Sequence, residues 1–203
     1  MFVRTGYFTG DPARVDRALD GLSAEAVGLL SAEPGYVGYG LFADRELGII
    51  TMGSWWATRQ NERDSAERLR GRRDELLAPF AGTATVDVWE AAEVAQAPAV
   101  APGSWFRLVR FDLAGADRER IAARFREDGL PAQRRIDGCL GGSMLLSAED
   151  ERGAVGILFA DRASLVASRG PAAEIRARGV TAGGLALRSL EEFETVLLDV
   201  RES

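Results

Sequence analysis

Residues 52–59, Met-Gly-Ser-Trp-Trp-Ala-Thr-Arg, return 103 positions later as residues 155–162, Val-Gly-Ile-Leu-Phe-Ala-Asp-Arg. Three other blocks repeat at an offset of 103 or 104: Phe2-Val3-Arg4 with Trp105-Phe106-Arg107, Gly35, Val37 and Gly38 with Gly138, Leu140 and Gly141, and Trp89-Glu90 with Phe193-Glu194. A drift of one residue over four blocks indicates a tandem duplication. We therefore expect two copies of one structural unit.

An alanine- and proline-rich stretch separates the two copies. Residues 93–103 carry no charge after Glu93 and show neither helical nor strand periodicity, which is typical of a linker. The chain of 203 residues is long enough for two domains of about 100 residues each. We predict a first repeat over residues 1–92, a linker over 93–103 and a second, less regular repeat over 104–203.

Each copy has the pattern of a β-α-β-β-α-β unit. In the first copy we predict strands over 2–9, 36–43, 47–56 and 83–90, a helix that begins at Asp11-Pro12 and a second helix over 59–78. In the second copy we predict strands over 105–113, 139–146, 154–160 and 189–198, and helices over 117–136 and 162–178. Gly129, Pro131 and the pair Gly170-Pro171 are expected to break these two helices.

Two helices and four strands per copy predict a sheet that is covered by helices on one face only. The economical way to bury the other face is to pack it against the twin sheet, and a covalent linker favours that pairing. The predicted fold class is therefore α+β, with two tandem ferredoxin-like units that form a pseudo-dimeric α+β barrel within one chain. We expect a space between the two sheets.

The composition excludes several kinds of chemistry. The chain has no His and no Lys, which excludes a Ser-His-Asp triad, a histidine haem ligand and a lysine Schiff base. Its one cysteine, Cys139, cannot form an internal disulfide or a thiolate metal cluster, and no metal site is expected. A net charge of −6 argues against a nucleic-acid partner. No run of about 18 apolar residues predicts a membrane span, so we expect a cytoplasmic protein.

Two motifs resemble those of a known family. Pro34-Gly35-Tyr36-Val37-Gly38 and Trp56-Ala57-Thr58-Arg59 are similar to the entry to strand two and the exit from strand three in the antibiotic biosynthesis monooxygenase-like superfamily of dimeric α+β barrels. The resemblance covers most of the chain, twice. It implies oxidation of aromatic, polyketide-like molecules of secondary metabolism without metal or haem. Quinone-forming relatives have an Asn four residues before the strand-three Trp, where this chain has Met52.

The resemblance and the strand alternation together suggest a pocket in the first copy. Met52, Ser54 and Trp56 share one face of a strand, and we expect that face to line the space between the sheets. The residues predicted to act in catalysis are Trp56, Tyr39 and Arg4. The residues predicted to bind substrate are Tyr7, Tyr36, Met52, Ser54, Asp87, Trp89, Arg107 and Phe159. Asp87 is expected to pair with Arg4, and the second copy to act as a lid and partner.

The predicted function is a monooxygenase that lets a bound aromatic molecule react directly with O₂. No tightly bound cofactor is expected, and reduced flavin stays open as a co-substrate. One alternative is a non-catalytic protein that binds an aromatic intermediate, and another is a cofactor-free cyclase or isomerase in the same barrel. The sequence also leaves open whether fused pairs associate into a further homodimer.

Overall fold

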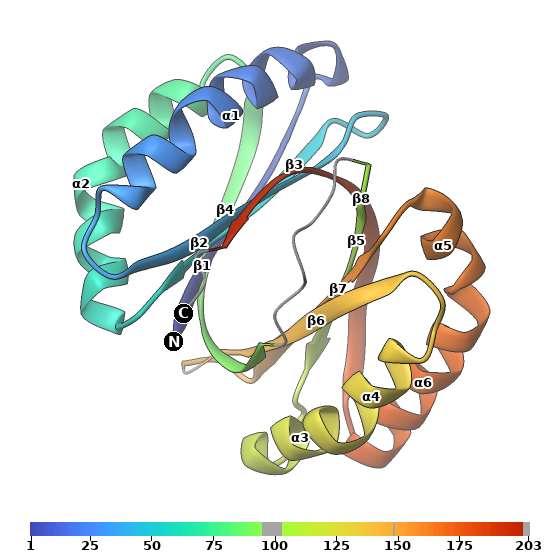
Figure 1. Ribbon diagram of the computed structural model, residues 1–203. Coiled ribbons are helices and arrows are strands. Elements are labelled where there is room, and N and C mark those ends of the chain that lie inside the picture. Colours follow the sequence, from blue (N-terminus) through green and yellow to red (C-terminus); the bar gives the residue numbers. More distant parts are fainter. Residues whose placement is uncertain (95–102, 148, 201–203) are drawn as a thin grey trace. The chain divides into compact units, whose positions relative to one another are not determined.

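Helices cover one face of each β-sheet in this computed structural model (Figure 1). The structure describes residues 1–94, 103–147 and 149–200, so most of the predicted linker 93–103 lies outside the described residues. The chain divides into unit 1, which comprises Met1–Trp89 and Thr195–Ser203, and unit 2, which comprises Glu90–Glu194. The fold is α+β with antiparallel strands, as predicted. In the described part of the chain, no helix is long and apolar enough to cross a membrane.

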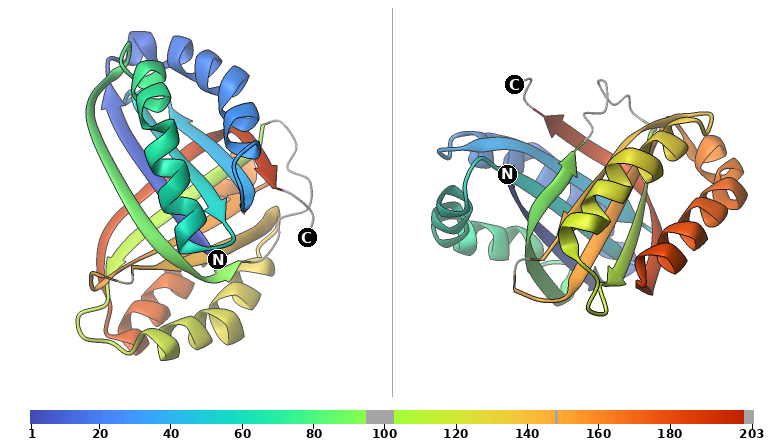
Figure 2. Two further views of the ribbon diagram at one scale, coloured as in Figure 1. Left: turned by 90° about the vertical axis from the view of Figure 1, so that its left-hand side faces the viewer. Right: turned by 90° about the horizontal axis from the view of Figure 1, so that it is seen from below.

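Unit 1 contains two long helices over one sheet. Its elements are β1 (Phe2–Gly10), α1 (Val15–Ser31), β2 (Tyr36–Asp44), β3 (Ile49–Trp56), α2 (Arg59–Leu77), most of β4 (Ala81–Val94) and the end of β8 (Ala186–Val200). The strand order is β4–β1–β3–β2–β8. A 3-10 turn, Pro12–Arg14, precedes α1, and the Asp11 carboxylate caps it by accepting from the amide of Ala13. The helices lie side by side over the sheet (Figure 2).

Unit 2 repeats this arrangement with shorter helices. Its elements are the end of β4, β5 (Trp105–Asp112), α3 (Arg118–Arg124), a π-helical turn (Phe125–Gly129), α4 (Leu130–Arg134), β6 (Cys139–Leu146), β7 (Arg152–Phe159), α5 (Arg162–Ala167), α6 (Arg169–Gly183) and most of β8. The strand order is β8–β5–β7–β6–β4. The units and the repeats are therefore different divisions of the chain, because β4 and β8 each contribute residues to both units.

The helix breaks of the second copy differ from those predicted. The chain stays helical through Gly129 and Pro131, because it widens into the π-helical turn just before the proline that lacks an amide hydrogen. The second break lies at Ser168, between α5 and α6. Gly170 and Pro171 lie in the first turn of α6, where a proline removes no helical hydrogen bond.

Gly35 and Gly138 make the same tight turn before β2 and β6. Their φ angles are 74° and 76°, in the left-handed region that favours glycine. The carbonyl of Gly35 accepts from the amide of Ala57, and that of Gly138 accepts from the amide of Ala160, both at 2.8 Å. The turn thus connects the start of β2 to the end of β3 in unit 1. In unit 2 it connects the start of β6 to the end of β7 in the same way.

We expect Gly35→Ala to lower the free energy of unfolding by about 1–3 kcal/mol. Its Cβ would clash with the side-chain amide of Asn61, in addition to the strain of a positive φ. Gly28→Ala is the matched control, since Gly28 lies on the exposed side of α1 with open space around it. That control should stabilise the protein by up to about 1 kcal/mol. Urea unfolding of both variants checks this, and an equal effect of the two would contradict it.

Candidate functional site

A row of three polar side chains crosses the middle of the unit 1 sheet. Ser54 on β3 lies directly opposite Arg4 on β1 and directly opposite Tyr39 on β2. Because directly opposed residues of neighbouring strands point to the same face, the three side chains lie beside one another. The next row holds Gly6, Met52 and Leu41, and the row on the other side holds Phe2, Trp56 and Tyr36. Three residues of this face were predicted from the alternation of β3, namely Met52, Ser54 and Trp56.

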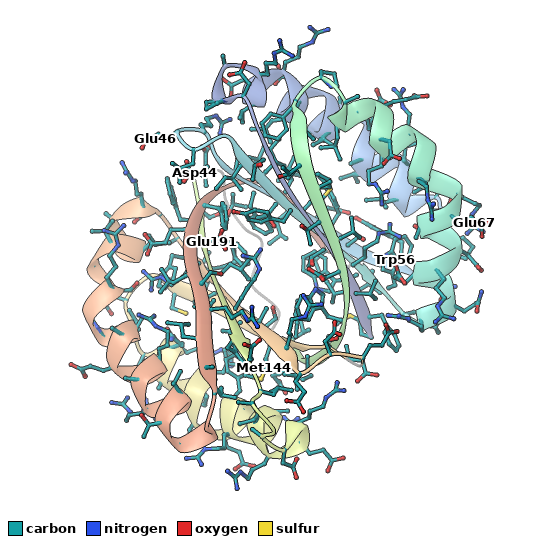
Figure 3. All side chains as sticks on the ribbon, turned by 180° about the vertical axis from the view of Figure 1, so that it is seen from behind. Asp44, Glu46, Trp56, Glu67, Met144 and Glu191 are labelled. Atoms are coloured by element: carbon teal, nitrogen blue, oxygen red, sulfur yellow. The ribbon has the colours of Figure 1, made fainter. Side chains whose placement is uncertain are left out.

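This face of the sheet packs beneath α1 and α2. Trp56 is fully buried in a core cluster with apolar residues of α1, and Figure 3 places it on the side of the sheet that the helices cover. The cavity that Met52 and Ser54 line therefore lies inside unit 1, between its sheet and its helices. The predicted location, a space between two sheets, is wrong for these residues, because alternation alone does not tell which face the helices cover.

The cavity has a volume of about 70 Å³. Its sheet side holds Arg4, Gly6, Phe8, Tyr39, Met52 and Ser54. Its helix side holds apolar residues of α1 and α2 together with two arginines: Leu22, Ala26, Leu29, Leu30, Ala66, Leu69, Leu76, Arg72 and Arg73. A small group of polar side chains thus faces an apolar wall, which is the usual composition of a binding site for a small organic molecule.

Arg4 is held from the side of α2. Its Nη1 donates to the carbonyl oxygen of Glu62 at 3.1 Å and to the Glu62 carboxylate at 3.4 Å, and its Nη2 donates to Oγ of Ser65 at 3.3 Å. The guanidinium also lies over the Trp56 ring, 5.4 Å from its centroid. Burial lowers the pKa of Arg4, and the carboxylate of Glu62 partly offsets this effect. These partners of Arg4 come from α2, whereas the prediction named Asp87 on β4.

Tyr39 and Ser54 keep donor capacity beside Arg4. Among the described residues the Tyr39 hydroxyl donates only to the thioether of Met52, at 3.8 Å, which is a weak acceptor. Burial raises the pKa of the Tyr39 phenol, so it stays a neutral donor at neutral pH. Oγ of Ser54 accepts from Nε1 of Trp56 at 3.0 Å, which leaves its own hydroxyl hydrogen to donate. The site can therefore offer two hydroxyl donors and a guanidinium to one bound molecule.

The other predicted site residues lie elsewhere. Tyr36 packs edge-on against Trp56, and its hydroxyl donates to the carboxylate of Asp199 at 2.7 Å. Nε1 of Trp89 donates to Oγ1 of Thr5, so Trp89 lies on the opposite face of the sheet from Arg4. By strand alternation Tyr7 and Asp87 share that opposite face. Arg107 and Phe159 lie in unit 2, each almost completely buried.

Unit 2 repeats the site with its polar row replaced. Arg107 lies opposite Ile157, and Ile157 lies opposite Gly142. These three residues take the places of Arg4, Ser54 and Tyr39, in that order. Arg107 lies over the Phe159 ring at 5.1 Å and donates to Oγ of Ser168 and to the carbonyl of Leu165, both at 2.9 Å. Ser168 and Leu165 stand 103 positions after Ser65 and Glu62.

The main difference is the carboxylate that Arg107 binds. Nε and Nη2 of Arg107 donate to one oxygen of Glu192 at 3.0 and 2.7 Å. Burial alone would raise the pKa of Glu192, but hydrogen bonds from Arg169 and Arg107 hold it below its ordinary value. Ile157, Phe125 and Leu165 share one buried apolar cluster around this site. The arginine of unit 2 is thus enclosed and neutralised by the protein itself.

Sequence reasoning missed the groups that hold the two arginines in place. Glu62 and Ser65 belong to an arginine-rich helix that has the pattern of an exposed surface, yet both are almost completely buried. One signal could have found Ser65. It recurs as Ser168 at the same offset that relates Arg4 and Arg107, so two polar residues are kept together in both repeats.

The comparisons with known proteins agree with this architecture. No model of a known protein family matches the sequence. The uncharacterized protein Rv2558 of Mycobacterium tuberculosis is 26% identical over 202 residues, which cover 99% of this chain and 86% of that protein. A proposed monooxygenase from Lactobacillus acidophilus superposes with a TM-score of 0.73 at 10% identity, over 98% of this chain and 95% of that one. The chain therefore has the same α+β fold as this structure.

An anthrone oxidase-like protein also shares this fold, with a TM-score of 0.62 at 11% identity over 99% of this chain and 91% of that one. The predicted resemblance is confirmed for the fold, and it includes both repeats because these matches span nearly the whole chain. At such identities a monooxygenase-like fold does not decide the chemistry, which has to be argued from the site.

Proposed function

We propose that the cavity of unit 1 binds an electron-rich aromatic molecule and promotes its oxygenation by O₂. The observation that carries the proposal is the row Arg4–Ser54–Tyr39, which brings three hydrogen-bond donors to one side of an apolar cavity. A substrate of secondary metabolism with several fused rings, such as an aromatic polyketide, is the proposed class. Figure 3 gives the position of Trp56, the ring on which Arg4 rests.

The proposed reaction needs no group that the chain lacks. An ionised substrate transfers one electron to O₂, and the substrate radical and superoxide combine into a carbon-bound peroxide. The peroxide then loses its outer oxygen and the remaining C–H hydrogen as hydroxide, which leaves a ring carbonyl. The hydroxide takes up the proton that the substrate released on ionisation and becomes water. A CH₂ group and O₂ are thereby converted into C=O and H₂O, and the substrate supplies all four electrons.

The chain's contribution is to hold the substrate and to stabilise the charge that moves onto oxygen. Tyr39 and Ser54 offer hydroxyl hydrogens that are fixed before the reaction, which is the most effective form of such stabilisation. Arg4 offers a positive charge in a site with little water, where it acts more strongly than at the surface. The apolar residues of α1 and α2 keep water away from the peroxide.

The size of the cavity limits the substrate in the conformation described. In other proteins a cavity of about 150 Å³ holds benzene, and the cavity of unit 1 is about 70 Å³. A substrate with fused rings therefore requires α1 and α2 to move apart. Two surface ion pairs connect α2 to α1 and the residues just after it: Arg68 with Glu33, and Arg72 with Glu25. In both pairs the arginine side chain is exposed to solvent.

Oxygen uptake tests the proposal directly. The purified protein is given phenolic substrates of one, two and three rings, the last an anthrone, with and without reduced flavin. Uptake without flavin supports direct reaction with O₂. Formation of the oxygenated product only with flavin makes reduced flavin a co-substrate, since free reduced flavin consumes O₂ by itself. Tight binding without uptake in every arm would reject the oxygenase in favour of a binding protein.

We expect Tyr39→Phe to lower turnover by about 100-fold, the usual effect of removing one donor to a developing oxyanion. Its stability should change by less than about 1 kcal/mol, since the hydroxyl bonds only to a thioether. Tyr36→Phe is the control, because it breaks a 2.7 Å bond to Asp199 outside the cavity. That variant should lose stability and keep its turnover. Unchanged turnover in Tyr39→Phe would remove Tyr39 from the mechanism.

A non-catalytic binding protein is the second candidate. One observation favours it: among the described residues that line the cavity there is no Asp, Glu, His or Cys to remove a proton. The same observation disfavours a cyclase or isomerase, which needs an acid–base group at the reacting atom. An oxygenase at this site requires a substrate that gives up its proton without such help.

A further inference from the structure

The lining of the unit 1 cavity is positively charged. Arg4, Arg72 and Arg73 line it, and no carboxylate among the described residues does so. Arg72 pairs with Glu25 and Glu75, and Arg73 pairs with Asp74, but these acids lie outside the lining. A ligand inside the cavity is therefore surrounded by guanidinium groups on one part of its surface and by apolar side chains on the rest.

Arg4 is less neutralised than its counterpart in unit 2. Its carboxylate partner, Glu62, approaches to 3.4 Å from the α2 side, whereas Glu192 approaches Arg107 to 2.7 Å. Within the described residues Nε of Arg4 makes no hydrogen bond, whereas Nε of Arg107 donates to Glu192. The side chain of Arg4 is nonetheless about nine-tenths buried, with an exposure of 10%.

In unit 2 the corresponding arginine, Arg107, has a strand carboxylate as its partner, which Arg4 lacks among the described residues. The carboxylate of Glu192 comes from β8 and occupies Nε and Nη2 of Arg107. At the repeat offset of 104, the residue of β4 that corresponds to Glu192 is Val88, which carries no charge. Unit 1 has thus kept the buried arginine, its serine partner and its aromatic neighbour, but it lacks the strand carboxylate that completes the arrangement in unit 2.

We propose that the unit 1 cavity selects small organic anions, carboxylates or phenolates on an apolar body, and that Arg4 binds the anionic group where Glu192 binds Arg107 in the other repeat. This inference rests on the proposed function, because it concerns the same cavity, and it adds the charge that the substrate carries. It also explains why the cavity lining needs no general base to ionise the substrate, because a ligand that enters as an anion has already lost its proton. Charge-assisted hydrogen bonds from a guanidinium are among the strongest that a site can offer.

Matched pairs of ligands test the charge. Butyrate is compared with butyramide and benzoate with benzamide, by calorimetry at constant ionic strength, and the two sizes show which body the cavity accepts. A phenol that ionises near neutral pH, measured above and below its pKa, distinguishes phenolate from carboxylate binding. We expect each anion to bind at least about tenfold more tightly than its neutral partner. Equal affinity within every pair would overturn the proposal.

Three variants test the role of Arg4. Arg4→Met with Glu62→Leu removes both charges and places at position 62 the type of residue that unit 2 has at Leu165, and it should abolish the preference for anions. Glu62→Leu alone keeps the bonds from Arg4 to the carbonyl of residue 62 and to Ser65, and it should strengthen anion binding by about tenfold. Glu62→Gln serves if the leucine variant does not fold.

Exposed residues of α2 provide the controls. Arg70→Met and Glu67→Leu change the net charge by the same amounts, and both residues lie on the outer side of α2 (Figure 3, for Glu67). Neither should change the preference for anions by more than about twofold, as expected for screened surface charges. Anion selectivity that survives the Arg4→Met, Glu62→Leu pair, or that Arg70→Met abolishes, would contradict the assignment. If anions bind but no oxygen is taken up, only the proposed oxygenase is rejected. If oxygen is taken up with neutral aromatic molecules and not with anions, only this inference is rejected.

Discussion

Arg107→Met is expected to lower the free energy of unfolding by about 3–5 kcal/mol, the usual effect of breaking a buried ion pair from one side. The variant leaves the Glu192 carboxylate without the bonds at 3.0 and 2.7 Å, and it removes the donors to Ser168 and Leu165. Chemical unfolding followed by circular dichroism measures the loss. A loss below about 1 kcal/mol would show that the pair is no more than a surface salt bridge.

The double variant Arg107→Met, Glu192→Leu is the control, because it removes both charges and should recover most of the stability. The pH dependence gives a second check. The pKa of Glu192 is lower in the folded protein than its ordinary value, through its arginine partners. Its stabilising contribution is therefore complete above the unfolded pKa and is lost as the pH falls through the folded one. The double variant should show less destabilisation by acid than the wild type.

Ala26→Leu is expected to abolish ligand binding and oxygen uptake without lowering stability. Ala26 is buried on α1 and lines the cavity, so a leucine there fills the space of about 70 Å³ that a ligand needs. Filling a cavity replaces an empty volume by packed atoms, which stabilises when no strain results. Calorimetric titration with benzoate and a thermal melt measure the two effects on one sample.

Ala24→Leu is the matched control, since Ala24 lies on the exposed side of the same helix and undergoes the same change. It should bind and turn over ligand like the wild type. If Ala26→Leu overpacks the core and fails to fold, Ala26→Val makes the same test with less added volume. A folded Ala26→Leu or Ala26→Val variant that keeps full affinity would place the ligand outside this cavity.

The elements and the duplication could be predicted because their signals are local. The capping pair Asp11-Pro12, the apolar spacing along α1 and the glycines at 35 and 138 each act within a few residues. The end of the second-copy helices was harder. The π-helical turn before Pro131 and the break at Ser168 depend on how those helices pack on their sheet, which the helical spacing does not encode.

The candidate site was predicted in part. Alternation along β3 correctly grouped Met52, Ser54 and Trp56 on one face, but it could not say that this face lies beneath the helices. Tyr7, Asp87 and Trp89 lie on the other face of the sheet, away from this cavity, and their predicted role in binding stays a prediction. The partner of Arg4 could not be inferred either, because Glu62 comes from a helix whose other charged residues face solvent.

A crystal structure of the protein with bound benzoate tests the central claim most directly. We expect the ring between the helices and the sheet of unit 1, against Ala26 and Leu69, with the carboxylate within hydrogen-bond distance of Arg4. We expect no ligand beside Arg107, where Glu192 already occupies the guanidinium. Benzoate bound in unit 2 or on the opposite face of the unit 1 sheet, with the cavity empty, would contradict the claim.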